Sequence, residues 1–135
     1  MEFNGSGTLY IRAFTAGGAL PVEGVLVRIR GTDEENRLVE YSVLTDKDGL
    51  TEKISLPAPD KSYSLSSGAP EAPYATYEVE IFGGGFYRKH FFNVAVFDGT
   101  DSFQPVAMIP LAGVRDEEVF PEGNLAAVGE QNENL

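Results

Sequence analysis

Two aspartates and a glycine fall within four residues in the segment TDKDG, as Asp46, Asp48 and Gly49. Many calcium loops begin with aspartates that alternate in this way before a glycine, because calcium prefers oxygen ligands. An EF-hand loop that began at Asp46 would carry leucine, threonine and proline where it needs an oxygen ligand, a glycine and a glutamate. A hairpin turn explains the same residues, since Asp46 can cap backbone N–H groups and Gly49 can adopt a positive φ. We therefore predict a turn without a metal ion, and whether Asp46 and Asp48 bind calcium stays open.

The segment FYRKHFF, residues 86–92, interleaves aromatic and basic residues. On an extended strand, one face of this segment would present rings and cations that can stack against a sugar ring or contact a peptide. We predict a ligand face made of Tyr87, Arg88, His90 and Phe92. The alternative interpretation is that one set of these aromatic residues belongs to the core, and that the basic set forms a solvated strand face.

Catalysis by a nucleophile or a metal ion finds little support in the sequence. The chain has no cysteine, one histidine and no G-x-S-x-G segment, so neither a thiol nucleophile nor a serine triad is predicted. The triple glycine at 83–85 lacks the lysine of a phosphate-binding loop. Glu78 and Glu80 fall on one side of a strand and are interpreted as a solvated face. We predict no catalytic residue, no cofactor and no metal ligand, and a chain that is not an enzyme; a small carboxylate hydrolase is the remaining catalytic alternative.

Composition and charge bound the class of protein. The 135 residues suit one domain, and a hydrophobic fraction of 42% predicts a folded core. A net charge of −11 argues against nucleic acids and anionic membrane surfaces as partners, since binding to phosphates relies on basic residues. No segment is long and apolar enough to span a membrane, and no secretory signal is visible at the N-terminus, so the localisation stays open.

Apolar and polar residues alternate in seven segments, with the two-residue period of a β-strand. These segments cover residues 7–14, 22–31, 38–45, 50–57, 74–82, 86–97 and 102–111. The alternation fails near Asn93, which predicts a bend or a bulge there. Pro105 and Pro110 lack a backbone N–H, which predicts that the final strand lies at a sheet edge or ends there. Short strands at regular spacing, with no helix predicted before residue 112, indicate an all-β sandwich.

The predicted β-sandwich domain covers residues 7–111. Residues 1–6 are predicted to form a disordered or flexible N-terminus. Residues 57–73 are rich in proline and serine, which predicts a long surface loop or a crossover at a sheet edge. The acidic segment 112–135 is predicted to be a linker or a C-terminal extension.

The order of these motifs resembles that of the carboxypeptidase regulatory-like domains. The segments that carry the resemblance are GTLYIRAF, LPVEGVLVRIRG, TDKDGL, YEVEIFGGGFY and FQPVAMIPL, and together they span about residues 7–111. The resemblance implies the fold of that family, which is a transthyretin-like (prealbumin-like) antiparallel β-sandwich of about seven strands.

A closer likeness is to the N-terminal domain of clostridial peptidoglycan-binding and spore cortex-lytic-type proteins. It is carried by LPVEGVLV, YSVLTDKDGLT, PYATYEVEI and QPVAMIPL. In those proteins catalysis, where present, lies in other domains. The resemblance implies a non-catalytic accessory module of a bacterial cell-wall or spore-associated protein, with the other domains of the parent protein as partners and a cell-envelope or spore location. The alternative function is a module that binds cell-wall glycan or peptide through residues 86–92.

Similar sandwiches in bacterial surface adhesins form an internal amide bond between a lysine on an early strand and an asparagine or aspartate. Here the first two predicted strands carry Arg12, Arg28 and Arg30 and no lysine. An arginine stays protonated and cannot be the nucleophile. The nearest lysines, Lys47 and Lys53, flank the TDKDG turn, and we predict that no such crosslink forms.

Overall fold

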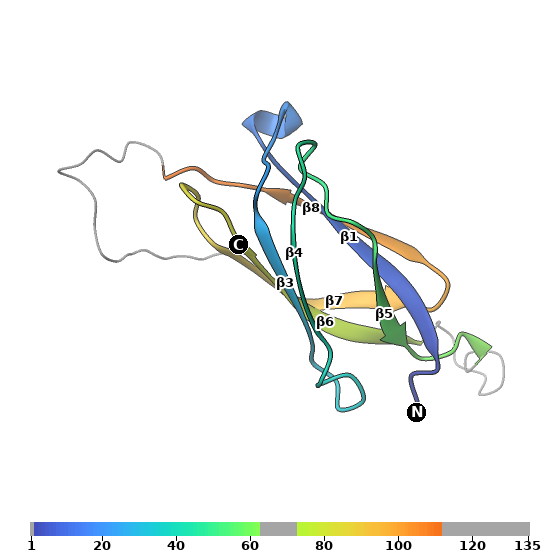
Figure 1. Cartoon of the computed structure of the whole chain (residues 1–135). Helices are drawn as coiled ribbons and strands as arrows, with labels where there is room; N and C mark the ends of the chain where they lie inside the picture. Colours follow the sequence, from blue (N-terminus) through green and yellow to red (C-terminus); the bar gives the residue numbers. More distant parts are fainter. Residues whose placement is uncertain (1, 63–72, 112–135) are drawn as a thin grey trace.

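The computed structural model describes residues 2–62 and 73–111, and there the chain forms an all-β sandwich (Figure 1). The strands are β1 (Gly5–Thr15), β2 (Leu20–Pro21), β3 (Leu26–Gly31), β4 (Glu40–Leu44), β5 (Ile54–Ala58), β6 (Tyr74–Phe82), β7 (Lys89–Phe97) and β8 (Asp101–Ala107), and a short 3-10 helix, η1 (Ala16–Gly18), follows β1. The predicted all-β sandwich is confirmed.

Two of the predicted segments lie at least partly outside the described residues. The predicted loop 57–73 is described up to residue 62 and again at residue 73, and the predicted extension 112–135 lies outside the described residues. The predictions for those segments therefore stay predictions. No helix in the described ranges is long and apolar enough to cross a membrane.

Two four-stranded sheets make the sandwich. Sheet B has the order β4-β3-β6-β7, and all of its neighbouring strands run antiparallel. In sheet A, β1 pairs with β2 and β5 in antiparallel register and with β8 in parallel register. The predicted antiparallel arrangement therefore holds except for the β1–β8 pair. The alternation of apolar residues shows which side of a strand is buried, but it carries no information on the direction of the partner strand.

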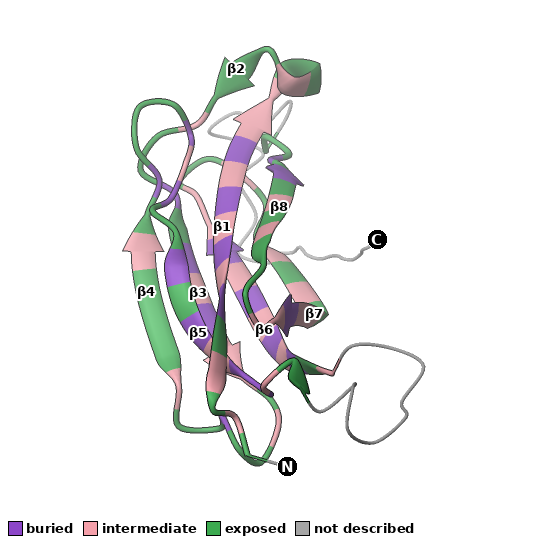
Figure 2. Ribbon diagram, turned by 90° about the vertical axis from the view of Figure 1, so that its right-hand side faces the viewer, coloured by how far each residue is buried: buried purple, intermediate pink, exposed green. Residues whose placement is uncertain are grey.

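The core lies between the two sheets and is built mainly from one side of β1, β3, β5, β6, β7 and β8. On β1, Leu9, Ile11 and Ala13 are buried and the residues between them are not, so buried bands alternate along the strand in Figure 2. The buried apolar residues are Leu9, Ile11, Ala13, Val25, Val27, Ile29, Ile54, Leu56, Ala58, Ala75, Tyr77, Val79, Ile81, Val96, Val106 and Met108. This arrangement follows the two-residue period of the sequence.

A buried threonine sets the start of β3. The Thr45 hydroxyl accepts a hydrogen bond from the Val25 N–H at 2.9 Å and donates one to the Val22 carbonyl oxygen at 2.8 Å. These bonds satisfy the Val25 N–H and the Val22 carbonyl oxygen, and the Thr45 N–H also donates to the Val25 carbonyl oxygen at 3.0 Å. The strand β3 itself begins at Leu26, four residues after the predicted start at residue 22.

The predicted irregularity near Asn93 is confirmed as a β-bulge. Tyr77 of β6 pairs with Val94 of β7, whereas Val79 pairs with Phe91, so two residues of β7 lie opposite one residue of β6. Asn93 takes a positive φ of 58°, in the left-handed region that asparagine tolerates better than most residues. A bulge bends its strand and re-aims the side chains beside it.

β8 lies at an edge of sheet A, as the prolines of its segment predict. Pro105 lies within the strand, and Pro110 forms an isolated bridge to Phe86 beyond its end. Next to that bridge, the Leu111 N–H donates to the Gly85 carbonyl oxygen at 3.0 Å. The chain after β8 therefore reaches the connection between β6 and β7 in sheet B.

β1 begins at Gly5, so residues 5 and 6 belong to sheet A and not to a flexible N-terminus. The Ser6 N–H donates to the Asp98 carboxylate at 3.0 Å. A Cβ at Gly7 would lie 2.1 Å from the Phe97 carbonyl oxygen, so this glycine lets β1 pass close to the end of β7. Glycine and serine carry no apolar alternation, which is why the sequence does not reveal this part of the strand.

Candidate functional site

The TDKDG segment forms a turn that leads from sheet B to sheet A. One Asp46 carboxylate oxygen accepts hydrogen bonds from the N–H groups of Asp48 and Leu50, at 2.8 and 3.0 Å. Gly49 has a φ of 78°, and a Cβ there would lie 2.3 Å from the Ala13 carbonyl oxygen. The predicted roles of Asp46 and Gly49 are confirmed. The predicted hairpin is wrong, because the strands on the two sides of the turn do not pair with each other: β4 pairs with β3, and β5 pairs with β1. A turn motif predicts that the chain reverses direction, but it does not predict which sheet the next strand joins.

The hydrogen bonds of this turn bear on whether its carboxylates can bind a cation. The Asp46 oxygen that caps the turn already accepts two N–H groups, and an ion would have to compete with them. In residues 2–62 and 73–111, no three histidine, aspartate or glutamate side chains gather closely enough to hold a metal ion.

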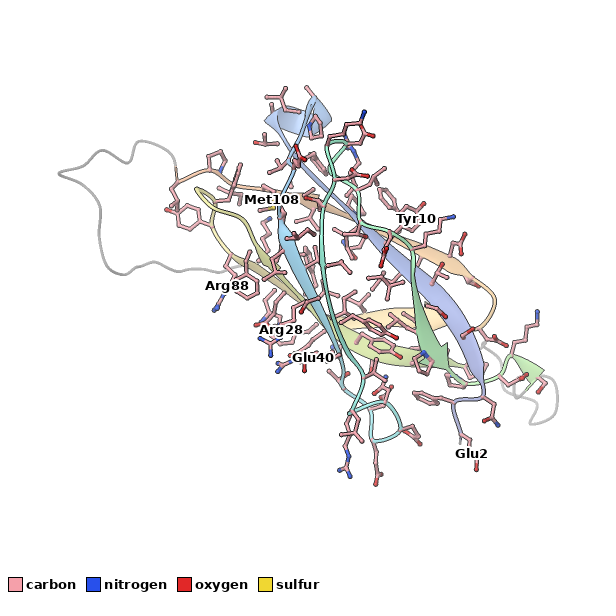
Figure 3. The ribbon with its side chains drawn as sticks, in the orientation of Figure 1. Glu2, Tyr10, Arg28, Glu40, Arg88 and Met108 are labelled. Atoms are coloured by element: carbon pink, nitrogen blue, oxygen red, sulfur yellow. The ribbon has the colours of Figure 1, made fainter. Side chains whose placement is uncertain are left out.

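The outer side of sheet B carries the predicted ligand residues. We name it the sheet B face, and it comprises Leu26, Arg28, Arg30, Glu40, Leu44, Glu78, Glu80, Phe82, Arg88, His90 and Phe92. Ion pairs cross it from strand to strand: Arg30 Nη2 lies 2.9 Å from Glu78 Oε2, and Arg28 Nε lies 2.8 Å from Glu40 Oε2. Figure 3 shows Arg28, Glu40 and Arg88 on this side of the sandwich.

His90 lies between the two glutamates of β6. Its Nε2 is 3.5 Å from Glu78 Oε2, and its Nδ1 is 4.0 Å from Glu80 Oε2. The two glutamate side chains are each 14% exposed and are also paired with Arg30 and Arg28. The imidazole is therefore held from the side of β6 by groups whose own positions are fixed.

The ring of Phe92 stacks on that of His90, with centroids 4.1 Å apart and ring planes 29° apart. Phe92 nevertheless remains 66% exposed. It directly precedes Asn93, which adopts the positive φ in the bulge. Bulges and uncommon backbone conformations of this kind occur preferentially at functional sites, where they aim a side chain. The result is an exposed aromatic ring in a defined position.

Arg88 lies on the same face as the stacked pair. Its guanidinium carbon is 5.5 Å from the ring centroid of Phe82, in a cation–π contact. Tyr87 is 41% exposed, but it precedes the start of β7 and its N–H donates to the segment after β8. The structure thus brings His90 and Phe92 into contact and Arg88 onto their face, whereas Tyr87 lies in the connection before the strand.

The alternative interpretation of this segment is correct for the other aromatic residues. Phe86 and Phe91 are partly buried and pack against the core. Lys89 pairs with Ile81 of β6, and burial lowers the pKa of its ammonium group. FYRKHFF therefore divides between an inner side that completes the core and an outer side that carries His90 and Phe92.

The opposite side of the sandwich carries a second aromatic surface that the sequence did not predict as a site. We name it the sheet A face, and it comprises Thr8, Tyr10, Arg12, Phe14, Lys53, Asp101, Phe103 and Pro105. Tyr10 pairs with Phe103 in the parallel β1–β8 register, and their ring centroids are 4.9 Å apart. The two-residue period places Tyr10 and Arg12 on one side of β1, but only the parallel pairing brings Phe103 beside them.

An ion pair fixes one end of the sheet A face. Lys53 Nζ lies 3.0 Å from Asp101 Oδ2, and the Thr8 hydroxyl donates to Asp101 Oδ1. Hydrogen bonds from Thr8 and Lys53 lower the pKa of the Asp101 carboxyl, and the hydrogen bond to Asp101 raises the pKa of the Lys53 ammonium. Both groups are therefore charged over a wide pH range.

Comparisons with known proteins show the fold of the chain and no family. No family model matches it, and no curated protein matches it. Similar solved structures include the Bacillus anthracis TIE protein, with 14% identity and a TM-score of 0.52 over 78% of this chain and 17% of that one. Hydroxyquinol 1,2-dioxygenase from Pseudomonas putida DLL-E4 has 12% identity and a TM-score of 0.52 over 78% of this chain and 56% of that one. Catechol 1,2-dioxygenase from Acinetobacter sp. ADP1 has 13% identity and a TM-score of 0.52 over 92% of this chain and 59% of that one.

These similarities correct one prediction. The sequence predicts that the chain is not an enzyme, because it shows no motif for a nucleophile or a metal ion. The similarity to two dioxygenases contradicts that prediction, since the same fold occurs within enzymes and does not exclude catalysis. This chain spans less than two thirds of the length of each of the three similar structures, and at 12–14% identity the likeness assigns no reaction to it.

Proposed function

We propose that this domain is a saccharide-binding accessory module that contacts a cell-wall glycan through the sheet B face. The observation that carries the proposal is the stacked pair of His90 and Phe92, with ring centroids 4.1 Å apart and Phe92 66% exposed. A sugar ring has a face of C–H groups and a rim of hydroxyl groups. It therefore packs on an exposed aromatic ring and forms hydrogen bonds with polar groups beside that ring.

The neighbours of Phe92 supply such polar groups. Arg88 offers donors, the Glu78 and Glu80 carboxylates offer acceptors, and the His90 imidazole lies 3.5 Å from Glu78 Oε2. The glutamates are already held by the arginines of β3, at 2.9 Å in the pair of Glu78 with Arg30. Groups that are ordered before binding lose little conformational entropy when a ligand arrives, which favours affinity.

The cell-wall context of the proposal comes from the motif order. The resemblance to the N-terminal domain of clostridial peptidoglycan-binding and spore cortex-lytic-type proteins supports a location in the cell envelope or the spore. It also supports the other domains of the parent protein as partners. The net charge of −11 favours a ligand that is not strongly anionic.

Co-sedimentation of the 135-residue chain with purified insoluble peptidoglycan tests the proposal. The wild type should enter the pellet, and Phe92→Ala should weaken binding about tenfold, which corresponds to about 1.4 kcal/mol. Leu38→Ala is the matched control, because Leu38 is an apolar side chain that is 91% exposed in another part of the surface. A wild type that stays in the supernatant, or a Phe92→Ala variant that sediments like the wild type, would contradict the proposal.

A further inference from the structure

We propose that the sheet A face holds a second saccharide-binding site, centred on Phe103 and Asp101, and that its ligand is a neutral oligosaccharide. The site does not rest on the proposed role of Phe92. β7 belongs to sheet B and β8 to sheet A, and Figure 3 shows Tyr10, the partner of Phe103, on the opposite side of the sandwich from Arg88.

Three side chains form a row across sheet A and end in an exposed ring. Lys53 Nζ lies 5.4 Å from the centroid of the Tyr10 ring, and the Tyr10 and Phe103 centroids are 4.9 Å apart with ring planes at 33°. Phe103 is the outermost member because β8 is the edge strand, and it is 47% exposed. The Tyr10 ring packs against the Phe103 ring and restricts its movement, so a ligand can pack on a ring that is ordered before binding.

An anchored carboxylate lies beside that ring. Asp101 is two residues before Phe103 on β8, so both side chains lie on the same side of the sheet, about 7 Å apart along the strand. The carboxylate is held by Lys53 at 3.0 Å and by the Thr8 hydroxyl. A carboxylate has about four acceptor positions, so it can also accept hydrogen bonds from the hydroxyl groups of a sugar stacked on Phe103.

The spacing along β8 suits several linked sugar units. Pro105 follows Phe103 by two residues on the same side and is exposed. A saccharide chain that runs along β8 would meet the carboxylate, the aromatic ring and the proline ring in turn. An oligosaccharide therefore uses more of this surface than a single sugar does.

The charges of the face argue for a neutral ligand. Lys53 is paired with Asp101, while the Arg12 guanidinium donates to the Gly18 carbonyl oxygen at 3.1 Å and lies 5.3 Å from the Phe14 ring centroid. Both cations are thus engaged within the protein. An anionic polymer would in addition meet a chain whose net charge is −11. The remaining chemistry, exposed rings beside anchored polar groups, matches a neutral carbohydrate.

Amide shift mapping by NMR on the isotope-labelled chain tests this site. The probes are two hexasaccharides, one of β-1,4-linked glucose and one of β-1,4-linked N-acetylglucosamine. At least one should shift the amide signals of residues 8–14 and 101–107. The apparent dissociation constant obtained from these shifts should rise about tenfold or more in Phe103→Ala and in Asp101→Asn, whereas Phe103→Tyr should keep the wild-type value.

The outcome is separable from that of the proposed function. Phe92→Ala should leave the shifts in β1 and β8 unchanged, because Phe92 lies on the other sheet. The proposal is overturned if neither hexasaccharide shifts β1 and β8, if Phe103→Ala binds as tightly as the wild type, or if Phe92→Ala removes the β8 shifts. Phe103→Ala should keep the fold, because the side chain that it changes is 47% exposed. The test therefore remains valid even if Asp101→Asn, which removes the ion pair with Lys53, destabilises the protein.

Discussion

The Tyr77 hydroxyl on β6 donates a hydrogen bond to the Pro57 carbonyl oxygen on β5, at a distance of 2.6 Å. The bond joins the two layers, since β6 belongs to sheet B and β5 to sheet A. Tyr77 is fully buried, and burial raises the pKa of its phenol to about 12. Ionisation would remove the donated proton and leave a charge inside the core, so the sandwich favours the protonated form.

We predict that alkaline pH destabilises the protein through Tyr77. The folded-state pKa of about 12 exceeds the ordinary value of 10.0, so the stability contributed by the protonated phenol is fully present below pH 10 and is lost as the pH rises through 12. Over this window the free energy of unfolding of the wild type should fall by about 2 kcal/mol more than that of Tyr77→Phe. Denaturant unfolding at several pH values measures this difference. Tyr87→Phe, at a tyrosine that is 41% exposed, should behave like the wild type. Equal pH dependence in the wild type and Tyr77→Phe would count against the prediction.

Gly49→Ala should destabilise the fold by about 2 kcal/mol or more, because the new Cβ meets both a strained φ and a close backbone atom. The φ of Gly49 is 78°, and a Cβ would lie 2.3 Å from the Ala13 carbonyl oxygen. Thermal or denaturant unfolding measures the loss. Gly84→Ala is the matched control, since a Cβ at Gly84 has nothing within 4 Å. A Gly49→Ala variant as stable as Gly84→Ala would show that the turn is not constrained in this way.

Asn36→Ala should cost about 2 kcal/mol, since it removes two hydrogen bonds of a buried side chain and takes away the side-chain acceptor of the Asp33 N–H. Asn36 is 1% exposed, donates from Nδ2 to the Thr76 carbonyl oxygen at 3.1 Å, and accepts at Oδ1 from the Asp33 N–H at 2.8 Å. It therefore ties the connection between β3 and β4 to β6. Glu34→Ala, an exposed substitution in the same connection, should change the free energy of unfolding by less than about 0.5 kcal/mol. Similar losses in the two variants would contradict the assigned role.

The Lys53–Asp101 pair should remain an ion pair and not become an amide crosslink. The two side chains are 57% and 56% exposed, and each holds the other in its charged form, whereas amide formation needs a neutral amine. The intact mass of the purified chain should equal the mass calculated for the linear sequence with no loss of water. A mass lower by one water, absent from Lys53→Arg, would show that the crosslink forms.

The fold was predictable where the two-residue period of the sequence is clear. β6 covers residues 74–82 as predicted, with Tyr77, Val79 and Ile81 fully buried. The bulge at Asn93 was predictable because the alternation fails there. The parallel pairing of β8 with β1 was not predictable, because direction depends on which sheet the chain enters after β7. For the same reason the TDKDG turn could be recognised as a turn but not as a passage between sheets.

The candidate site was predictable only in part. His90 and Phe92 could be assigned to one side of a strand from their spacing, but their stacking depends on the bulge and on the glutamates of β6. The surface around Phe103 escaped prediction because its parts come from β1, β8 and the segment before β5, which only tertiary structure brings together. Pairing between distant strands is set by the whole fold and not by local pattern.

The most direct test of the proposed function is calorimetric titration of the wild type and Phe92→Ala with the same soluble peptidoglycan fragment. If the stacked His90–Phe92 pair is the binding platform, the wild type binds saturably and Phe92→Ala raises the dissociation constant about tenfold. Equal dissociation constants in the two proteins, or no heat of binding with the wild type, would contradict the claim that the sheet B face binds cell-wall glycan.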